Sequence, residues 1–263
     1  MPNDATRLDE LTSLLGPRTM WRPVEWVPTT GSTNADLSAR ARLGETEGAV
    51  RIADEQTSGR GRLARTWVSP ARSSVAISVL LKPEHGPTAW GWLSLLAGMA
   101  ITEALEELSP AGVSVELKWP NDVLIDGKKV CGILSERIEH ADGARAVVGM
   151  GINIALTEDE LPVPNATSLA LAGFEVNTLD VVAGVLRHFE NLYRGWREDP
   201  DLRVAYQRRC ASVGAELRIV VSDTETVTGR GVGVDEFGRL LVETARGVRA
   251  FAVGDVIHAR LPR

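Results

Sequence analysis

The sequence is poor in cysteine and histidine, and this scarcity excludes several kinds of protein. Its 263 residues include two cysteines and four histidines. Cys131 and Cys210 lie far apart in the chain and give no sign of a disulfide framework, so a reducing compartment such as the cytoplasm is expected. The histidines stand singly, without the spacing of metal ligands. We therefore expect no metal site built by the protein, although a metal could still enter on a nucleotide.

Long apolar segments and an excess of basic residues are also missing. No uninterrupted apolar stretch approaches the ~20 residues of a transmembrane helix. Residues 1–20 lack the basic start and apolar centre of a signal peptide. Lys and Arg total 29 against 35 Asp and Glu, which gives a net charge of −6. Because neutralising nucleic-acid phosphates takes a clustered basic face, neither a membrane nor nucleic acid is expected as the main partner.

The pattern of the chain changes near residue 210. Apolar residues at helical spacing predict helices over 35–43, 88–108 and 180–197. Strands are predicted where β-branched residues lie between turn-forming flanks, at 49–53, 74–81, 113–118, 122–125, 130–137 and 146–154. Beyond residue 210 the segments are short and alternating, at 217–222, 227–234, 240–244, 248–252 and 256–259. The sequence predicts an α+β protein with a tail over 1–20, a sheet packed by helices over 21–209, and a small β-barrel over 210–263.

One short segment combines backbone flexibility with fixed positive charge. Gly59-Arg60-Gly61-Arg62 interleaves two glycines with two arginines. Glycine lets backbone amides approach an anion, and the arginine guanidinium is a permanently charged planar donor that matches carboxylate or phosphate. The segment suits an anionic reactant, but it is also compatible with a solvated basic turn. Similar runs occur in flexible RNA-binding tails, yet those are low-complexity sequence and this run lies between expected strands.

A second segment places polar and charged groups around two turns. Residues 118–122 read Lys-Trp-Pro-Asn-Asp, and the proline restricts the turn. Asp126-Gly127 then separates two expected strands and predicts a hairpin, because glycine adopts positive φ without steric cost. Lys129 follows directly. These groups could bind a ligand. Pro-Asn-Asp is also a common turn sequence with no role in binding.

Two further segments fit either a binding site or a structural role. Residues 149–153 place glycines inside an apolar strand, which indicates close approach of a ligand, another backbone or a packed helix. Ser32-Thr33-Asn34 precedes an expected helix, and any of the three could cap its N-terminus. A capping role for one residue does not exclude ligand contact by its neighbours.

In this order and spacing, the segments resemble the catalytic domain of biotin protein ligases. That family shows an STN turn, a Gln before GRGRxGRxW, then KWPND, a KxxGI-like segment and GxGxN. The matching positions are Ser32-Thr33-Asn34, Gln56, and residues 59–67, 118–122, 129–133 and 149–153. The resemblance implies a class II synthetase-like domain with a mixed sheet packed by helices, followed by a small C-terminal SH3-like β-barrel.

The resemblance has two departures. Ala64 stands at the second glycine position after GRGR, and we expect altered loop kinetics rather than lost activity. Regulatory members of the family carry an N-terminal helix-turn-helix domain, whereas about twenty residues precede the expected sheet domain here. The resemblance is therefore to the form without a DNA-binding domain.

The family's activity implies two half-reactions, with ATP and biotin as substrates and Mg²⁺ as the accompanying metal ion. Biotin and ATP would form biotinyl-5′-AMP, and biotin would then pass to a specific lysine of the biotin carboxyl carrier protein domain of an acyl-CoA carboxylase. Mg²⁺ would arrive with the ATP phosphates.

The resemblance also assigns roles to individual residues. Catalysis is assigned to Arg62 and Lys129. From its place at the end of the proline-restricted turn we add Asp122, to orient or deprotonate the acceptor amine, although an acidic side chain in such a turn also fits a structural role. Biotin binding is assigned to Ser32, Thr33, Asn34, Gln56, Arg60, Gly61, Arg62, Lys129 and Gly132. ATP binding is assigned to Arg60, Arg65, Trp67, Lys118, Asn121 and Asn153.

Three other functions share part of this pattern. Lipoate or octanoate transfer uses the same fold and acyl-adenylate chemistry, but the KWPND segment beside the GRGR loop argues against it. A biotin-sensing transcriptional regulator is disfavoured by the acidic balance. A non-catalytic carboxylase-assembly module would release no pyrophosphate.

Overall fold

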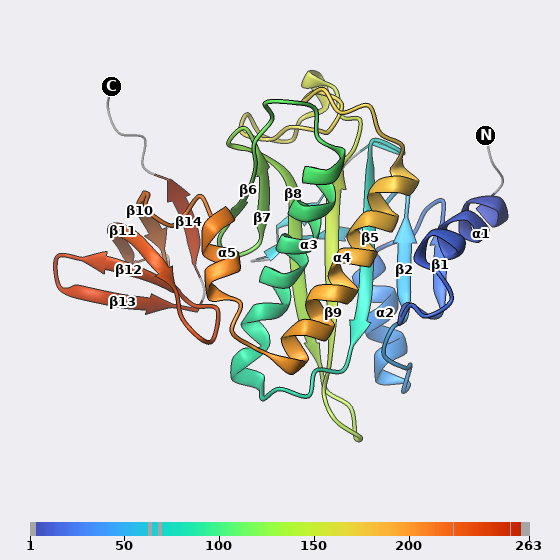
Figure 1. Cartoon of the computed structure of the whole chain (residues 1–263), viewed down its shortest axis with the longest axis horizontal. Coiled ribbons are helices and arrows are strands. Elements are labelled where there is room, and N and C mark those ends of the chain that lie inside the picture. The colour runs from blue at the N-terminus through green and yellow to red at the C-terminus, as the bar shows by residue number, and fades with distance from the viewer. Residues whose placement is uncertain (1–3, 63–64, 68–69, 223, 253, 259–263) are drawn as a thin grey trace.

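A computed structural model of the chain describes residues 4–62, 65–67, 70–222, 224–252 and 254–258. Its centre is a seven-stranded sheet in the order β1-β2-β5-β9-β8-β7-β6 (Figure 1). β1 and β2 are parallel and all other neighbours are antiparallel, so the predicted mixed sheet is confirmed. The strands are Val24–Val27 (β1), Val50–Ala53 (β2), Ser74–Leu81 (β5), Val115–Lys118 (β6), Asp122–Ile125 (β7), Lys128–Ile138 (β8) and Arg145–Asn153 (β9).

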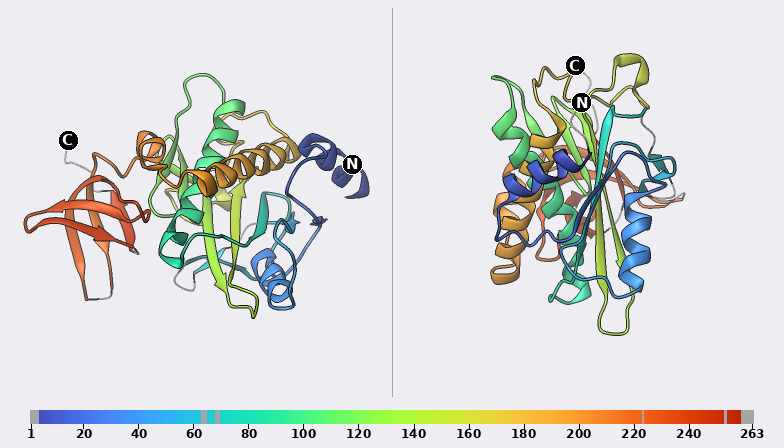
Figure 2. Two further views of the ribbon diagram at one scale, coloured as in Figure 1. Left: turned by 60° about the horizontal axis from the view of Figure 1, so that its bottom comes forward. Right: turned by 90° about the vertical axis from the view of Figure 1, so that its right-hand side faces the viewer.

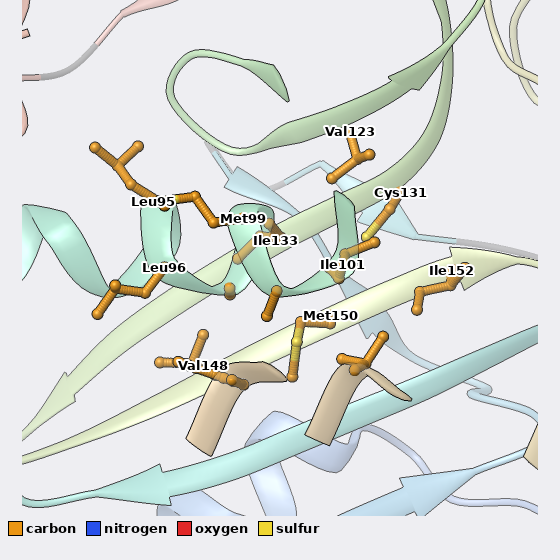
Figure 3. Close-up of a cluster of buried hydrophobic side chains, with 14 of the residues drawn as sticks. Leu95, Leu96, Met99, Ile101, Val123, Cys131, Ile133, Val148, Met150 and Ile152 are labelled. Atoms are coloured by element: carbon orange, nitrogen blue, oxygen red, sulfur yellow. The ribbon is translucent and has the colours of Figure 1, made fainter. Parts of the chain in front are cut away.

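Helices cover both faces of this sheet. The helices α3 (Trp92–Leu108) and α4 (Thr178–Glu198) lie on one face, and α2 (Thr33–Arg42) lies on the other (Figure 2). Every residue of β5, an interior strand of the sheet, is buried, which explains its nearly continuous apolar sequence. Figure 3 shows the core on the α3 side, where Met99 and Ile101 face Ile133 of β8 and Met150 of β9. The expected helix over 88–108 divides into the 3₁₀ turn η2 (Pro87–Gly91) and α3.

The N-terminal segment differs from the tail expected over residues 1–20. Asp4–Leu15 forms helix α1, which lies beside β1 and α4 (Figure 1). Leu11 is fully buried. Arg7 donates two hydrogen bonds to the Asp54 carboxylate, at 3.0 and 2.9 Å, and lies over the Trp26 ring. The helix was missed because few apolar residues mark its buried face, and its stability comes from tertiary packing.

The C-terminal segment forms a separate five-stranded antiparallel sheet in the order β13-β12-β11-β10-β14. It follows the short helix α5 (Arg203–Arg209), and its strands are Glu216–Val220 (β10), Thr226–Val234 (β11), Leu240–Thr244 (β12), Gly247–Phe251 (β13) and Asp255–His258 (β14). Two buried tryptophans of the larger domain bind its β11–β12 turn: Trp92 Nε1 donates to Glu236 O at 2.9 Å, and Trp119 Nε1 donates to Gly238 O at 3.0 Å. The predicted small β domain is therefore docked on the sheet domain.

Two turns have the local structure that the sequence predicts. Asp126 and Gly127 connect β7 and β8 with φ values of 47° and 75°, which is the backbone of a primed hairpin turn. Residues 119–121 form the turn between β6 and β7. In the described part of the chain, no helix is both long and apolar enough to cross a bilayer.

Candidate active site

The predicted site residues line one cavity of about 500 Å³. They come from the start of α2, the segment around the two-stranded ribbon β3 (Gly59–Arg60) and β4 (Thr66–Trp67), the end of β6 and start of β7 with the turn between them, the first half of β8 and the end of β9. The cavity residues that were predicted from the sequence are Ser32, Thr33, Asn34, Gln56, Arg60, Gly61, Arg62, Arg65, Trp67, Lys118, Asn121, Asp122, Lys129, Gly132 and Asn153. Segments distant in sequence therefore meet at one place, while Ala64 lies outside the described residues.

At the start of α2, some polar groups are free to bind a ligand in the cavity and others already form hydrogen bonds within the protein. Ser32 is the N-cap of α2 and accepts a hydrogen bond from Ala35 N at 3.4 Å. Thr33 donates to Gln56 Oε1 through both its backbone N, at 2.8 Å, and its hydroxyl, at 3.1 Å. Both bonds reach the carbonyl oxygen of Gln56, so its Nε2, which has no partner among the described residues, is left as a donor beside the cavity.

Both the amide oxygen and the amide nitrogen of the Asn34 side chain form hydrogen bonds within the protein. Its Oδ1 accepts from the hydroxyl of the fully buried Ser78 at 2.7 Å. Its Nδ2 donates to Leu134 O at 3.2 Å and to Glu136 Oε2 at 2.8 Å. Gly149 makes this position possible, because a Cβ there would overlap Asn34 Oδ1. Asn34 therefore ties α2 to β5 and β8 by hydrogen bonds and packs on Gly149 of β9.

Trp67 explains two of the strand glycines. A Cβ at Gly132 would lie 2.8 Å from Trp67 Cζ3, and one at Gly151 would lie 2.7 Å from Trp67 Cε2. The indole ring thus rests on the glycine surface of β8 and β9. Lys129 Nζ lies 5.7 Å from the centre of the same ring. Side chains, and not another backbone, are what approach Gly149 and Gly151.

Several cations are gathered in this cavity. Burial lowers the pKa of the Lys118 ammonium, and the nearby carboxylate of Asp122 partly opposes that shift. Burial also lowers the pKa of the Arg62 guanidinium, opposed first by Asp255. Arg62 donates to Asn121 Oδ1 at 3.1 Å. Gathering half-buried cations costs desolvation free energy, which an anionic ligand would offset.

Lys129 and Asp122 form an ion pair across neighbouring strands. Lys129 Nζ lies 2.7 Å from Asp122 Oδ1, and both side chains are largely buried. A bulge in the pairing of β7 and β8 falls between Val123 and Leu124, directly after Asp122. The pair places the two proposed catalytic groups at one point of the cavity wall.

The remaining residues that the sequence predicts to bind ATP have defined partners within the protein. Asn121 Nδ2 donates to Ile133 O at 2.8 Å, and Asn153 Nδ2 donates to Thr167 O at 2.9 Å. Arg65 forms an ion pair with Asp255 of β14. These contacts hold the side chains at the cavity.

Sequence reasoning missed two parts of the cavity wall. The C-terminal domain contributes Val220, Asp255, Val256 and Ile257. A loop after β9 contributes Pro162, Val163, Asn165 and Ala166, and Lys129 N donates to Asn165 O at 2.7 Å. Neither part carries a motif, so only the tertiary structure brings them to the site.

The side chains at the cavity do not form a cage for a metal ion. Among the described residues there is no group of three or more His, Cys, Asp or Glu that could hold one. The two carboxylates that line the cavity, Asp122 and Asp255, are paired with Lys129 and Arg65. A divalent cation at this site would therefore need ligands from a bound nucleotide.

Comparison with known proteins first gives the broader class. The profile of the Biotin/lipoate A/B protein ligase family matches residues 26–153, and that of the Biotin protein ligase C terminal domain matches residues 218–259. The first match covers the glycine and arginine ribbon and the sheet, and the second covers most of the small β domain. The chain thus combines a ligase sheet domain with a C-terminal domain specific to one branch of that class.

Individual relatives identify the branch. The biotin--[acetyl-CoA-carboxylase] ligase of Mycobacterium tuberculosis is 37% identical over 94% of this chain and 93% of its own length. The bifunctional ligase/repressor BirA of Bacillus subtilis is 33% identical over 86% of this chain and 70% of its own length. A solved structure of Aquifex aeolicus biotin protein ligase in complex with biotin and ATP has a TM-score of 0.76 at 28% identity and covers 91% of this chain and 100% of that one. The chain belongs to the biotin protein ligase family.

Proposed function

We propose that this protein is an ATP-dependent biotin protein ligase that forms biotinyl-5′-AMP and then biotinylates a lysine of a biotin carboxyl carrier domain. The observation that carries the proposal is the single cavity in which fixed polar groups, apolar walls and several cations meet. Biotin has a polar ureido ring, an apolar body and a carboxylate. Its binding site therefore requires polar groups, apolar walls and cations in turn. The cations supply what two reacting anions need, because a carboxylate must approach a triphosphate.

We assign the ureido ring to the start of α2. The Ser32 hydroxyl proton and Gln56 Nε2 are the groups that could donate to the ureido oxygen, since Thr33 fixes the Gln56 amide. Thr33 and Asn34 have their polar atoms largely used within the protein, so we propose that they position their neighbours. Gly61 lets the ligand come close to the backbone at the cavity wall, and Gly132 serves the site by leaving room for the Trp67 ring.

In the first half-reaction, a carboxylate oxygen of biotin attacks the α-phosphorus of ATP. The bond from that phosphorus to the bridging oxygen breaks, and pyrophosphate leaves with its electron pair. Arg60, Arg62 and Lys129 would stabilise the developing negative charge, with the ribbon that holds Arg60 and Arg62 excluding water. Lys118, Arg65, Trp67, Asn121 and Asn153 would hold the nucleotide. Mg²⁺ would enter as the counterion of the ATP phosphates.

In the second half-reaction, the neutral ε-amine of the acceptor lysine attacks the carbonyl carbon of the mixed anhydride. The bond from that carbon to the phosphate oxygen breaks, AMP leaves, and the nitrogen loses a proton. Asp122 lies at the cavity wall and is our candidate either to orient the amine or to accept its proton. We propose a carrier domain of an acyl-CoA carboxylase as the acceptor. A cytoplasmic location fits the two free, buried cysteines.

The decisive experiment is exchange of labelled pyrophosphate into ATP by the purified protein, with biotin, lipoate and octanoate as parallel substrates. We expect exchange with biotin alone. Exchange with lipoate or octanoate in place of biotin would assign the protein to lipoyl transfer, and no exchange with any acid would favour the assembly-module alternative. A gel-shift assay with promoter DNA and biotin tests the regulator alternative, for which we expect no shift.

A further inference from the structure

Glu136 connects the buried start of α2 to the exposed arginine of the β3–β4 ribbon. It lies on β8, beyond the segments that carry the family resemblance. Its Oε2 accepts a hydrogen bond from Asn34 Nδ2 at 2.8 Å and forms an ion pair with Arg60 NH2 at 3.1 Å. One carboxylate oxygen therefore joins a buried amide to a cation that lines the cavity.

The buried end of this connection is held firmly. Asn34 is about 5% exposed, and its amide oxygen accepts from Ser78, which is completely buried. Its amide nitrogen also donates to Leu134 O of the strand that carries Glu136. Turning the Asn34 amide would break all of these hydrogen bonds. The orientation of the Glu136 carboxylate is thus determined from inside the protein.

The other end is exposed and lies on a short ribbon. The Arg60 side chain is 48% exposed and lies on a ribbon of only two residues per strand. Within the described part of the chain, Glu136 is its one ion-pair partner. An arginine side chain loses rotamer entropy when it is fixed. A partner that already restricts Arg60 reduces that loss when a ligand binds.

We propose that Glu136 is a positioning residue, which holds Arg60 toward the cavity so that the guanidinium is ready for the biotin carboxylate or the adenylate phosphate. This inference rests on the proposed function for the identity of that anion. The guanidinium has five N–H donors, so it can keep its bond to Glu136 while it donates to the ligand. Glu136 itself touches no reacting atom and acts through Arg60.

The kinetic test uses the full chain with Glu136→Ala, Glu136→Gln, Arg60→Ala and the double variant. In biotin-dependent pyrophosphate exchange, we expect Glu136→Ala to raise the KM for biotin about tenfold with a smaller change in kcat. Glu136→Gln keeps an acceptor for Asn34 and should recover part of that loss. In the Arg60→Ala background, Glu136→Ala should have no further effect. Additive effects in the double variant would overturn the proposal.

Glu139→Ala is the matched control. It removes an acidic side chain just beyond the end of the same strand, where Glu139 pairs with Arg137 at 2.6 Å. We expect a wild-type KM for biotin in this variant. A tenfold rise there would mean that loss of negative charge near β8, and not the link to Arg60, causes the effect.

A second readout needs no catalytic activity. Trypsin must draw the Arg60 side chain into its own pocket to cleave the bond after it, and the ion pair to Glu136 opposes this. Without ligand, Glu136→Ala should be cleaved after Arg60 about tenfold faster than wild type and Glu139→Ala, as followed by mass spectrometry. Equal cleavage would overturn the proposal even if wild-type exchange is normal. Absent exchange with faster cleavage would instead reject the proposed function alone.

Discussion

Lys129 and Asp122 show how one ion pair can serve two chemical steps. Lys129 is the cation that we place at the carboxylate and α-phosphate, and Asp122 is the carboxylate that we place at the acceptor amine. The first group matters while two anions are brought together, and the second matters when a proton leaves the amine. Their substitutions should therefore affect different half-reactions, although the side chains touch.

We expect Lys129→Ala to lower the rate of pyrophosphate exchange about 100-fold, because it removes a preorganised cation from the reacting anions. Asp122→Asn should keep most of the exchange activity and slow transfer from preformed biotinyl-AMP to the carrier domain by about 100-fold. Lys128→Ala is the control, since the neighbouring Lys128 is exposed. Near-normal exchange by Lys129→Ala, or unimpaired transfer by Asp122→Asn, would remove the corresponding role.

At the residue scale, the sequence predicted site members better than their partners. Ser32 was a candidate N-cap, and it is the N-cap of α2. The strand glycines predicted a close approach, which Asn34 and Trp67 make. Glu136 and Asp255 were missed because an acidic residue in a strand has no local signal. Their importance depends on which cation the fold brings beside them.

At the scale of elements, strands that lie between turn residues were predictable, whereas helix α5 and the two-residue ribbon strands were not. The predicted bounds of β5, β7 and β12 agree with the structure, because each combines a β-rich run with turn residues at both ends. Helix α5 has seven residues, too few to display a helical period. The short ribbon strands β3 and β4 pair by only two residues each, so no alternation could reveal them.

Helix α1 provides a prediction at this scale. Leu11→Ala should lower the free energy of unfolding by about 3 kcal/mol, because it leaves a cavity at a fully buried position. Urea denaturation followed by circular dichroism measures the change. Leu14→Ala lies on the same helix at a side chain that is 54% exposed, and it should change stability by less than about 0.5 kcal/mol. Equal effects of the two substitutions would show that α1 is not part of the cooperative fold.

At the scale of the whole molecule, the sheet domain and the small β domain are linked through buried groups. Trp92 and Trp119 are both about 1% exposed or less, and each donates to a backbone carbonyl of the β11–β12 turn. The boundary expected near residue 210 divides the chain by its pattern of elements, while these two bonds join the parts again. That link could not be predicted, since it depends on backbone carbonyls.

We therefore expect the chain to unfold in one transition, with tryptophan fluorescence and far-ultraviolet circular dichroism giving the same midpoint. Trp92→Phe keeps an aromatic ring but leaves Glu236 O without its donor, and should lower the unfolding free energy by about 1–3 kcal/mol. Trp90→Phe is a control on a half-buried tryptophan whose Nε1 donates to His85 O, within the sheet domain. Separate midpoints for the two probes in the wild-type protein would contradict the linked domains.

The contribution of β14 to the cavity wall also has a consequence for synthesis. The sheet side of the cavity is complete once β9 has been made, but Asp255, Val256 and Ile257 follow about 100 residues later. At roughly 5–20 residues per second, a ribosome needs about 5–20 seconds to add them. During that interval a nascent chain exposes Arg62 and Arg65, beside its ribbon, on the side that β14 will cover. Biotin activation should therefore begin only after the second domain has been translated and docked, which protects a reactive acyl phosphate from hydrolysis on unfinished chains.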